Sequence, residues 1–292
     1  MSTVTVHVGT RTYRGSGIDL SVEGLAPMAV YEAVVAETTG GAETVGETAG
    51  RVVVESPNPN TGYETLWRIC EKSTNSLLHS LAAAARSRGR TAPEDDERVN
   101  VEATLGSLDV PTVEMTAVRR RVADAGADEA RLGERVAELR GRLQARRETD
   151  ESTEGVGDVR QELSETVARL TEVETERIAA EQALERAERE AADARDARER
   201  RLRLEDRAAN LARAARRRLA EGVYDEFASA LRSVPGEADA GAGPQAFRGD
   251  PVTARLAAVR VADLDAPVVL SVDRFDDADA AADALDTPVV RV

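Results

Sequence analysis

The fold is decided by the stretch Glu148-Thr-Asp-Glu-Ser-Thr-Glu-Gly-Val-Gly157, which separates two long segments rich in Arg and Glu. The first segment covers about residues 91–147, and the second covers residues 158–219. Both segments are composed of good helix formers, whereas two glycines and several small polar residues disfavour a helix through the stretch between them. We therefore predict that the chain reverses here and that the two helices pair as an antiparallel coiled-coil hairpin.

Apolar residues recur along the first segment with the heptad spacing of a coiled-coil seam, interrupted by the polar Glu129. These residues are Val118, Val122, Ala125, Leu132, Val136, Leu139 and Leu143. The return segment carries Leu163, Val167, Leu170 and Leu184, with Glu174, Arg177 and Glu181 between them. A reversal near Thr153 places Leu139 opposite Val167 and Glu129 opposite Arg177. We predict that this ion pair sets the register of the two helices.

The end of the return segment is basic, and the part of the outgoing segment that would face it is acidic. The arginines include Arg198, Arg201, Arg216, Arg217 and Arg218. The facing acids are Glu94, Asp95, Asp96, Glu97, Glu102 and Asp109. We expect pairing within the molecule, and a phosphate-binding role for the arginines is the alternative. Together with Glu129 and Arg177, these five arginines are the candidate interaction residues.

The two ends of the chain show the patterns of short strands and helices. Val4–Val8 and residues 11–14 alternate around Gly9-Thr10, Pro27 fits the first turn of a helix, and residues 51–55 read as a strand. At the C-terminal end, we predict strands at 255–262, 267–272 and 289–292 and a helix at 276–285. Residues 1–58 or 251–292 alone are too few to bury a core. The predicted fold is therefore α+β: one mixed α/β body built from both ends, ββαβ at each end, with the hairpin inserted.

Residues 60–233 are predicted to form the helical module, with arms at about 92–147 and 158–219. Three pairs have the spacing of a capping box at a helix start: Thr61 with Glu64, Thr91 with Glu94, and Asp158 with Gln161. We expect the first helix to cover residues 62–88, Pro111 to break or kink the outgoing arm, and the return helix to end near Arg232. Residues 237–250 are rich in Gly, Ala and Asp and are predicted to be a flexible linker.

The composition is acidic and poor in lysine. The formal net charge is −15, and Lys72 is the only lysine among 39 basic residues. In molar salt the Debye length falls to about 3 Å, so a dense acidic surface repels itself weakly. This composition is typical of cytoplasmic proteins of salt-loving archaea. Neither a signal peptide nor an apolar run of about 20 residues is present, so we expect an intracellular protein that is not in a membrane.

No motif of a known catalytic or metal site occurs. The sequence lacks Gly-x-x-x-x-Gly-Lys-Ser/Thr and Gly-x-Ser-x-Gly, and its two histidines, His7 and His79, are far apart. Cys70 is the only cysteine, which excludes an intrachain disulfide and a multi-cysteine zinc site. We therefore predict no catalytic residue, no cofactor and no metal.

Part of the helical middle resembles a known kind of family. Leu81-Ala-Ala-Ala-Ala-Arg-Ser-Arg-Gly89 is followed by Thr91-x-Pro-x-Asp-Asp-Glu97 and by a long helix ending in Gly141-Arg-Leu-Gln-Ala-Arg-Arg147. These stretches resemble an uncharacterised haloarchaeal coiled-coil family, and the resemblance covers most of the helical middle. Since no activity is assigned to that family, the resemblance implies no site residues.

The sequence favours a non-enzymatic interaction or scaffold protein, whose coiled coil engages a protein partner or a second copy of the chain. The first alternative is a nucleic-acid-associated protein that uses the arginine-rich end of the return helix. The second alternative is an enzyme whose site lies on the α/β body.

Overall fold

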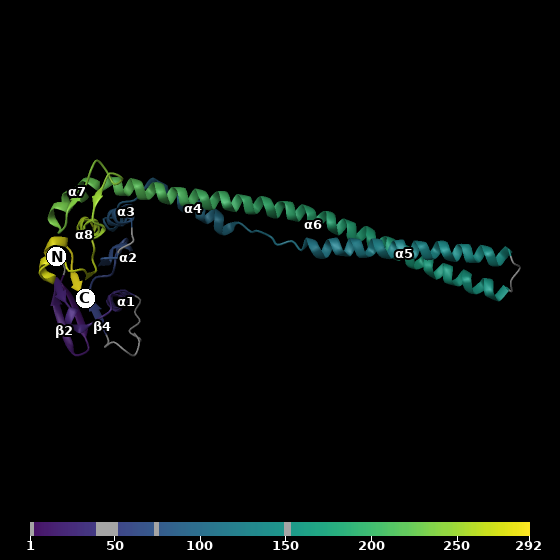
Figure 1. The fold of residues 1–292 in the computed structure, drawn as a ribbon, viewed down its shortest axis with the longest axis horizontal. Coiled ribbons are helices and arrows are strands. Elements are labelled where there is room, and N and C mark those ends of the chain that lie inside the picture. Colours follow the sequence, from purple (N-terminus) through teal and green to yellow (C-terminus); the bar gives the residue numbers. More distant parts are fainter. Residues whose placement is uncertain (1–2, 39–51, 73–75, 149–152) are drawn as a thin grey trace. The chain divides into compact units, whose positions relative to one another are not determined.

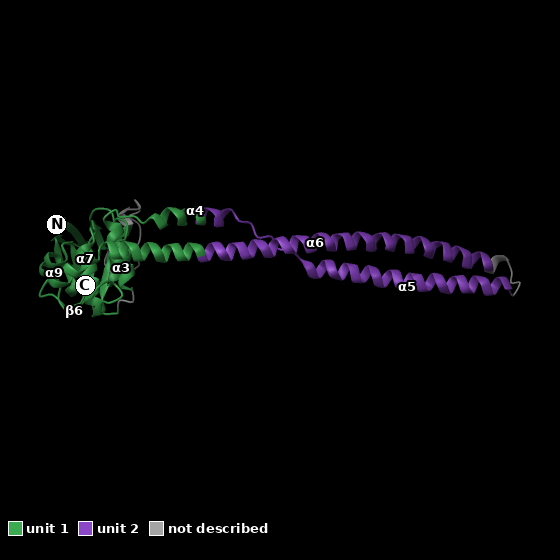
Figure 2. Cartoon of the chain, turned by 90° about the horizontal axis from the view of Figure 1, so that it is seen from above, with its two compact units in different colours: residues 1–101, 207–292 green, residues 102–206 purple. Residues whose placement is uncertain are grey.

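The computed structural model describes residues 3–38, 52–72, 76–148 and 153–292 (Figure 1). These residues form two compact units (Figure 2). Residues 1–101 and 207–292 make the first, called the body, and residues 102–206 make the second, called the hairpin. The mixed α+β class is as predicted, since strands from both chain ends form sheets and two long helices pack antiparallel.

A parallel sheet of four strands connects distant segments of the body. Its order is β3-β9-β8-β5, formed by Gly17–Asp19, Val289–Arg291, Val268–Ser271 and Arg68–Cys70. Ile18 pairs with Val290 and Ile69 with Leu270, so this sheet forms only when both ends of the chain come together. Strands β8 and β9 are buried runs of Val and Leu, as expected for parallel strands that are covered on both faces.

A second sheet is antiparallel and comes from the N-terminal end alone. Its order is β2-β1-β4, formed by Arg11–Gly15, Val4–Val8 and Val52–Glu55. The turn between β1 and β2 uses Gly9 at a φ of 58°, a conformation that glycine adopts without strain. Helix α1 (Pro27–Thr38) begins at the proline, after the short 3-10 turn η1 (Ser21–Glu23). The predicted hairpin, helix and strand of this end are confirmed, but the ββαβ order is wrong because the unpredicted strand β3 precedes the helix.

The other helices of the body pack on the parallel sheet or on one another, and one of them corrects the prediction. They are α2 (Tyr63–Leu66), α3 (Leu77–Ser87), α7 (Tyr224–Ala230) with η2 (Leu231–Ser233), α8 (Pro251–Val261) and α9 (Ala278–Leu285). The strand expected at 255–262 is wrong, because this segment lies in α8. The Asp250 side chain caps α8 by accepting a hydrogen bond from the Thr253 amide, and Pro251 follows it. The C-terminal end is therefore αβαβ.

The single helix expected over residues 62–88 is also wrong. Helix α2 is one turn long, β5 follows it as an edge strand of the parallel sheet, and α3 starts at Leu77 with Ser76 as its cap. Thr61 caps nothing here: the residue before α2 is Gly62, at a φ of 96°, without a side-chain hydrogen bond. Since β5 pairs with β8, residues 60–101 belong to the body and not to a separate helical module.

The linker expected at 237–250 is ordered structure in the body. Ala238–Asp239 (β6) and Arg248–Gly249 (β7) pair as a small antiparallel ribbon. The Tyr224 hydroxyl donates a hydrogen bond to the Ala240 carbonyl, and the rings of Phe227 and Phe247 lie 5.6 Å apart. These contacts hold the segment against α7, which also replaces the predicted extension of the return helix to Arg232.

The hairpin is formed by α5 (Met115–Glu148) and α6 (Thr153–Gly222), which lie side by side (Figure 2). The reversal between them falls on residues 149–152, outside the described residues. Helix α6 already includes Gly155 and Gly157, so the predicted start at Asp158 is wrong by five residues. Helix α4 (Pro93–Ser107) precedes α5, and the non-helical residues 108–114 between them confirm the predicted break at Pro111. At the start of α4, Asp95 rather than Glu94 accepts the hydrogen bond from the Ala92 amide.

The seam of the hairpin follows the predicted heptads on α5 and in part on α6, where Leu163, Leu170 and Leu184 are partly buried. Val136, Leu139 and Leu143 are buried on α5. In the hairpin part of α6 the buried residues are spaced by multiples of seven, and they are Val159, Thr166, Ala180, Ala187 and Ala194. Val167 is 37% exposed and Glu174 is exposed, so neither lies in the seam as predicted. Leu139 and Leu143 pack with Val159, and the partly buried Val156 and Leu163 lie against this cluster.

Candidate functional site

The structure brings Glu129 and Arg177 together across the hairpin. The Arg177 Nε lies 2.5 Å from a Glu129 carboxylate oxygen, and a second carboxylate, Glu181, pairs with the same guanidinium. Glu129 and Glu181 raise the pKa of Arg177 above its ordinary value, because two negative charges favour the cation. Arg135 on α5 and Glu162 on α6 form a further interhelical pair at 2.5 Å.

The arginine-rich end of α6 is only partly neutralised by α4. Arg218 binds Glu94 through two guanidinium nitrogens at 2.8–3.0 Å, and these hydrogen bonds lower the pKa of Glu94. Arg207 pairs with Glu97, another of the predicted acids. Within the hairpin, Arg201 pairs with Glu205 of its own helix at 2.9 Å.

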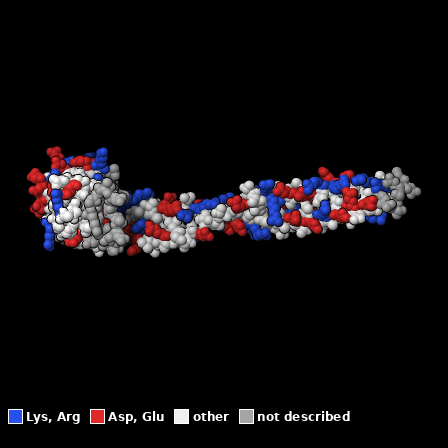
Figure 3. Space-filling view, turned by 90° about the horizontal axis from the view of Figure 1, so that it is seen from below, with Lys and Arg blue, Asp and Glu red and all other residues white. Residues whose placement is uncertain are grey.

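The remaining candidate arginines behave differently. Among the residues that the structure describes, neither Arg198 nor Arg217 has a carboxylate partner, and both side chains are exposed. On the face drawn in Figure 3, basic and acidic side chains alternate along the helices without a continuous area of one sign. Arg216 contacts His79 of α3, a contact that the sequence did not suggest.

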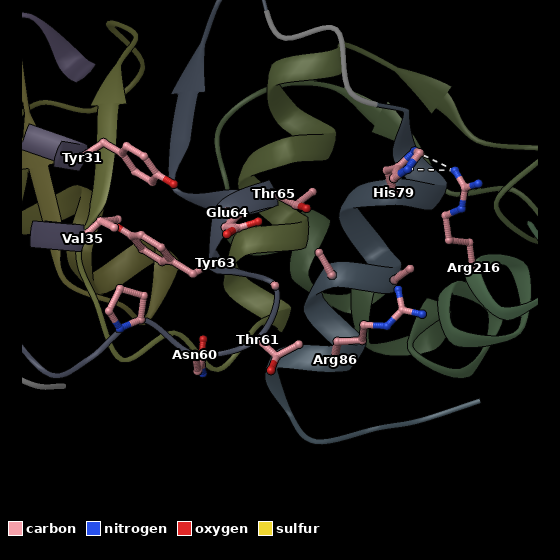
Figure 4. A pocket seen from close by; sticks show the side chains of 14 residues that line it. Tyr31, Val35, Asn60, Thr61, Tyr63, Glu64, Thr65, His79, Arg86 and Arg216 are labelled. Carbon is pink, nitrogen blue, oxygen red and sulfur yellow. Dashed lines mark hydrogen bonds between the residues drawn. The ribbon is translucent and has the colours of Figure 1, made fainter. Parts of the chain in front are cut away.

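That contact lies at the edge of a pocket in the body, with a volume of about 570 Å³ (Figure 4). Three parts of the chain surround it besides α6: helix α1, residues 59–65 including α2, and α3. Its polar and ionisable lining residues are Tyr31, Asn60, Thr61, Tyr63, Glu64, Thr65, His79, Arg86 and Arg216. The pocket is thus built where the chain leads into β5, at the amino end of that strand.

Two basic side chains and a histidine form one end of the pocket. Arg216 Nη1 lies 2.8 Å from His79 Nε2 and 3.3 Å from His79 Nδ1. Because the guanidinium can only donate, the ring nitrogen that accepts must carry no proton. Partial desolvation lowers the pKa of His79, and the nearby charges of Arg216 and Arg86 lower it further. Arg86 in turn pairs with Asp95 at 3.0 Å.

Aromatic side chains form the opposite end. The Tyr31 ring lies 4.5 Å from the Trp67 ring and 6.4 Å from that of Tyr63. Tyr63 is buried and donates its hydroxyl hydrogen to the Pro267 carbonyl at 2.7 Å, and burial raises its pKa. Tyr31 is therefore supported by a fixed aromatic cluster and presents a ring to the pocket (Figure 4).

Two residues hold the wall segment 59–65 in place. Gly62 packs so closely on α3 that a Cβ there would lie 2.4 Å from the Ala83 carbonyl oxygen. Arg255 of α8 is buried and donates hydrogen bonds to the carbonyls of Thr65 and Arg68 and to the Ser80 hydroxyl. Burial without a carboxylate partner lowers the pKa of Arg255 to about 10. The buried Arg255 thus connects α8 by hydrogen bonds to the two pocket walls, α3 and the segment 59–65.

Sequence reasoning did not find this pocket. Its basic residues come from α3 and α6, more than 100 positions apart, and residues 62–88 were expected to be one helix. Such a site has no local motif, so only the packing of the body reveals it. Among the described residues, no group of three or more His, Cys, Asp or Glu side chains is placed to hold a metal ion. Within the same part of the chain, no helix is long and apolar enough to cross a membrane.

One family model matches the chain, over residues 15–289, and it is described as a family of unknown function, DUF7856. The chain belongs to the DUF7856 family. The match spans the hairpin and nearly all of the body, so both units are part of what defines a DUF7856 protein. No curated protein and no solved structure matches the chain.

Proposed function

We propose that this DUF7856 protein is a non-enzymatic interaction protein whose hairpin binds a protein partner or a second copy of the chain. One observation carries the proposal. Three large apolar side chains of α6 are exposed on an otherwise charged helix: Val167 at 37%, Ile178 at 49% and Leu202 at 62%. Val167 and Ile178 are three helical turns apart and therefore share one face. Exposed apolar side chains rimmed by charges are typical of protein contact surfaces.

The charge pattern favours a protein over a nucleic acid. Nucleic-acid binding draws much of its affinity from positive side chains that contact phosphates and release counterions. Here Arg201, Arg207 and Arg218 are already paired with carboxylates, and acids are interspersed among the free arginines. Helix α6 therefore offers a surface of both signs, which suits another helical protein surface.

The composition supports a setting in molar salt, as in the cytoplasm of a salt-loving archaeon. At that ionic strength the Debye length is about 3 Å, so exposed ion pairs contribute little to binding. Apolar contacts are not screened by salt. We expect Ile178 and Leu202, rather than the surrounding arginines, to provide most of the binding free energy.

A pull-down with the full-length chain tests the proposal. A variant with Ile178→Ser and Leu202→Ser is expected to lose the partner or, in light scattering, the second copy. The matched control replaces Val22 and Met28 of the body, which are 85% and 47% exposed, by serine. The control is expected to bind as the unmodified chain does. Equal capture by both variants would contradict binding through the hairpin.

A further inference from the structure

We propose that the pocket in the body binds a small organic anion, a carboxylate or a phosphate ester, whose charged group contacts Arg216 and whose apolar part lies on Tyr31. The site lies wholly in the body and is independent of the role of the hairpin. Its volume of about 570 Å³ falls within the range of roughly 300–1,000 Å³ that is usual for small-molecule sites.

The first argument is that Arg216 lacks a carboxylate partner. Acidic residues outnumber basic ones by 54 to 39 in this chain, so a cation is expected to find a carboxylate nearby. Arg207 and Arg218 on the same helix do so. Within the described residues, Arg216 instead contacts the carbonyl of Ala212 and the ring of His79. Its remaining guanidinium donors can bind an external anion, which arginine binds in a defined geometry.

The second argument is the division of the pocket into a basic end and an aromatic end (Figure 4). Arg86, His79 and Arg216 lie on one side, and Tyr31 and Val35 lie on the other. Glu64 is the only carboxylate among the 14 lining residues shown, against two arginines. A ligand that matches both ends has a negative group joined to a flat or apolar part.

The third argument is that the pocket is formed before any ligand binds. Ala82 and Ala83 line it with small side chains, and Gly62 lets the 59–65 segment lie directly on α3. Arg255, through the Thr65 carbonyl, and the Tyr63 hydroxyl fix the same segment to the rest of the body. A fixed wall lowers the conformational entropy lost on binding, so even a small ligand can bind measurably.

The test is a titration of the full-length chain with four probes, at a constant KCl concentration that keeps it folded by circular dichroism. Phenyl phosphate and benzoate carry both charge and ring, inorganic phosphate carries charge alone, and benzyl alcohol carries the ring alone. The chain has two histidines, so the ring resonances of His79 can be assigned by NMR with a His7→Asn variant. Phenyl phosphate, benzoate or both are expected to shift the His79 signals with a dissociation constant on the order of 1 mM. The single-feature probes are expected to bind about tenfold more weakly.

Three variants complete the experiment. Arg216→Gln is expected to weaken binding about tenfold by removing a charge-assisted hydrogen bond. Glu64→Gln removes the one repelling carboxylate and is expected to strengthen binding, an effect that a purely structural role would not produce. Arg217→Gln, the exposed neighbour on α6, is the matched control and should leave binding unchanged.

If Arg216→Gln and the unmodified chain bind the aryl anions with equal dissociation constants, the proposed site is wrong. So does the absence of a His79 response to both aryl anions at concentrations tenfold above the expected constant. Inorganic phosphate binding as tightly as phenyl phosphate would overturn the role of Tyr31. If Arg216→Gln fails to fold, the decision falls to Glu64→Gln, where unchanged or weaker binding overturns the proposal.

Discussion

The body and the hairpin are stabilised by different means. The body buries large side chains completely, such as Leu256, Leu270 and Leu285, whereas much of the α6 seam consists of alanines, such as Ala180 and Ala187. Each alanine in place of a leucine forgoes about three carbon atoms of burial, at roughly 0.8 kcal/mol each. The hairpin therefore depends more on helix continuity and interhelical ion pairs. A charged surface of this kind is easy to recognise in a sequence but contributes little tertiary stability.

The largest expected effect comes from the buried cation of the body. Arg255→Ala leaves two carbonyls and a hydroxyl without their donor and opens a cavity. We expect a loss of about 3–5 kcal/mol in the free energy of unfolding, measured by urea denaturation. Arg260→Ala on the same helix is the control, at about 1 kcal/mol, because its carbonyl acceptors lie near the surface. If the two variants lower the free energy of unfolding equally, the hydrogen bonds of Arg255 do not stabilise the body as its contacts indicate.

The next effect tests the seam of the hairpin. Leu139 is fully buried whereas Val167 is 37% exposed. We expect Leu139→Ala to cost about 2–3 kcal/mol locally, seen as faster hydrogen–deuterium exchange of peptides from α5 and the start of α6. Val167→Ala should change exchange little, by less than about 0.5 kcal/mol. Comparable effects would instead favour the register in which Val167 faces Leu139.

A smaller effect is expected for the pKa of His79, which lies beside Arg216 in the body. His79 in the body is expected to titrate below its ordinary pKa of 6.5, and Arg216→Gln should raise that pKa. Since the folded pKa lies below the unfolded one, the fold is most stable above pH 6.5, and this stability is lost as the pH falls from there through the lowered folded pKa. Histidine NMR measures the titration directly. A pKa that does not respond to Arg216→Gln would show that the contact is absent in solution.

The smallest effect is expected at the ion pair of the hairpin. A double-mutant cycle of Glu129→Gln and Arg177→Gln should give a coupling energy that is small and decreases as KCl is raised, since both side chains reach solvent. Thermal unfolding at graded KCl measures it. A coupling that persists unchanged in molar salt would indicate that the pair is shielded from solvent and sets the register more firmly than the exposure suggests.

The sequence predicted the hairpin and the strands β1, β2, β4, β8 and β9, because each has solvent on one side or a short apolar run with clear boundaries. It did not predict α8. Leu256, Ala257, Ala258 and Val259 are all buried, so this helix has no polar face and no 3.6-residue period. The short strand β5 was hidden in an apolar stretch whose spacing also fits a helix.

The candidate interaction residues also include contacts that the sequence predicted and one that it did not. Glu129 and Arg177 could be paired from the sequence because both lie on long helices whose spacing is regular. Val167 departs from the predicted seam because it is exposed, but Glu129 and Arg177 meet as predicted. The contact between Arg216 and His79 depends on how α3 packs in the body, which no local pattern specifies.

The position of β9 in the parallel sheet has a consequence for the growing chain. Strand β9 lies between β3 and β8, yet it is synthesised after every other element described. At the usual 5–20 residues per second, β3 waits roughly 15–50 s for its neighbour. The helices of the hairpin, by contrast, need only nearby residues and can form while translation continues. The middle of the molecule can therefore fold first, and the central sheet closes last.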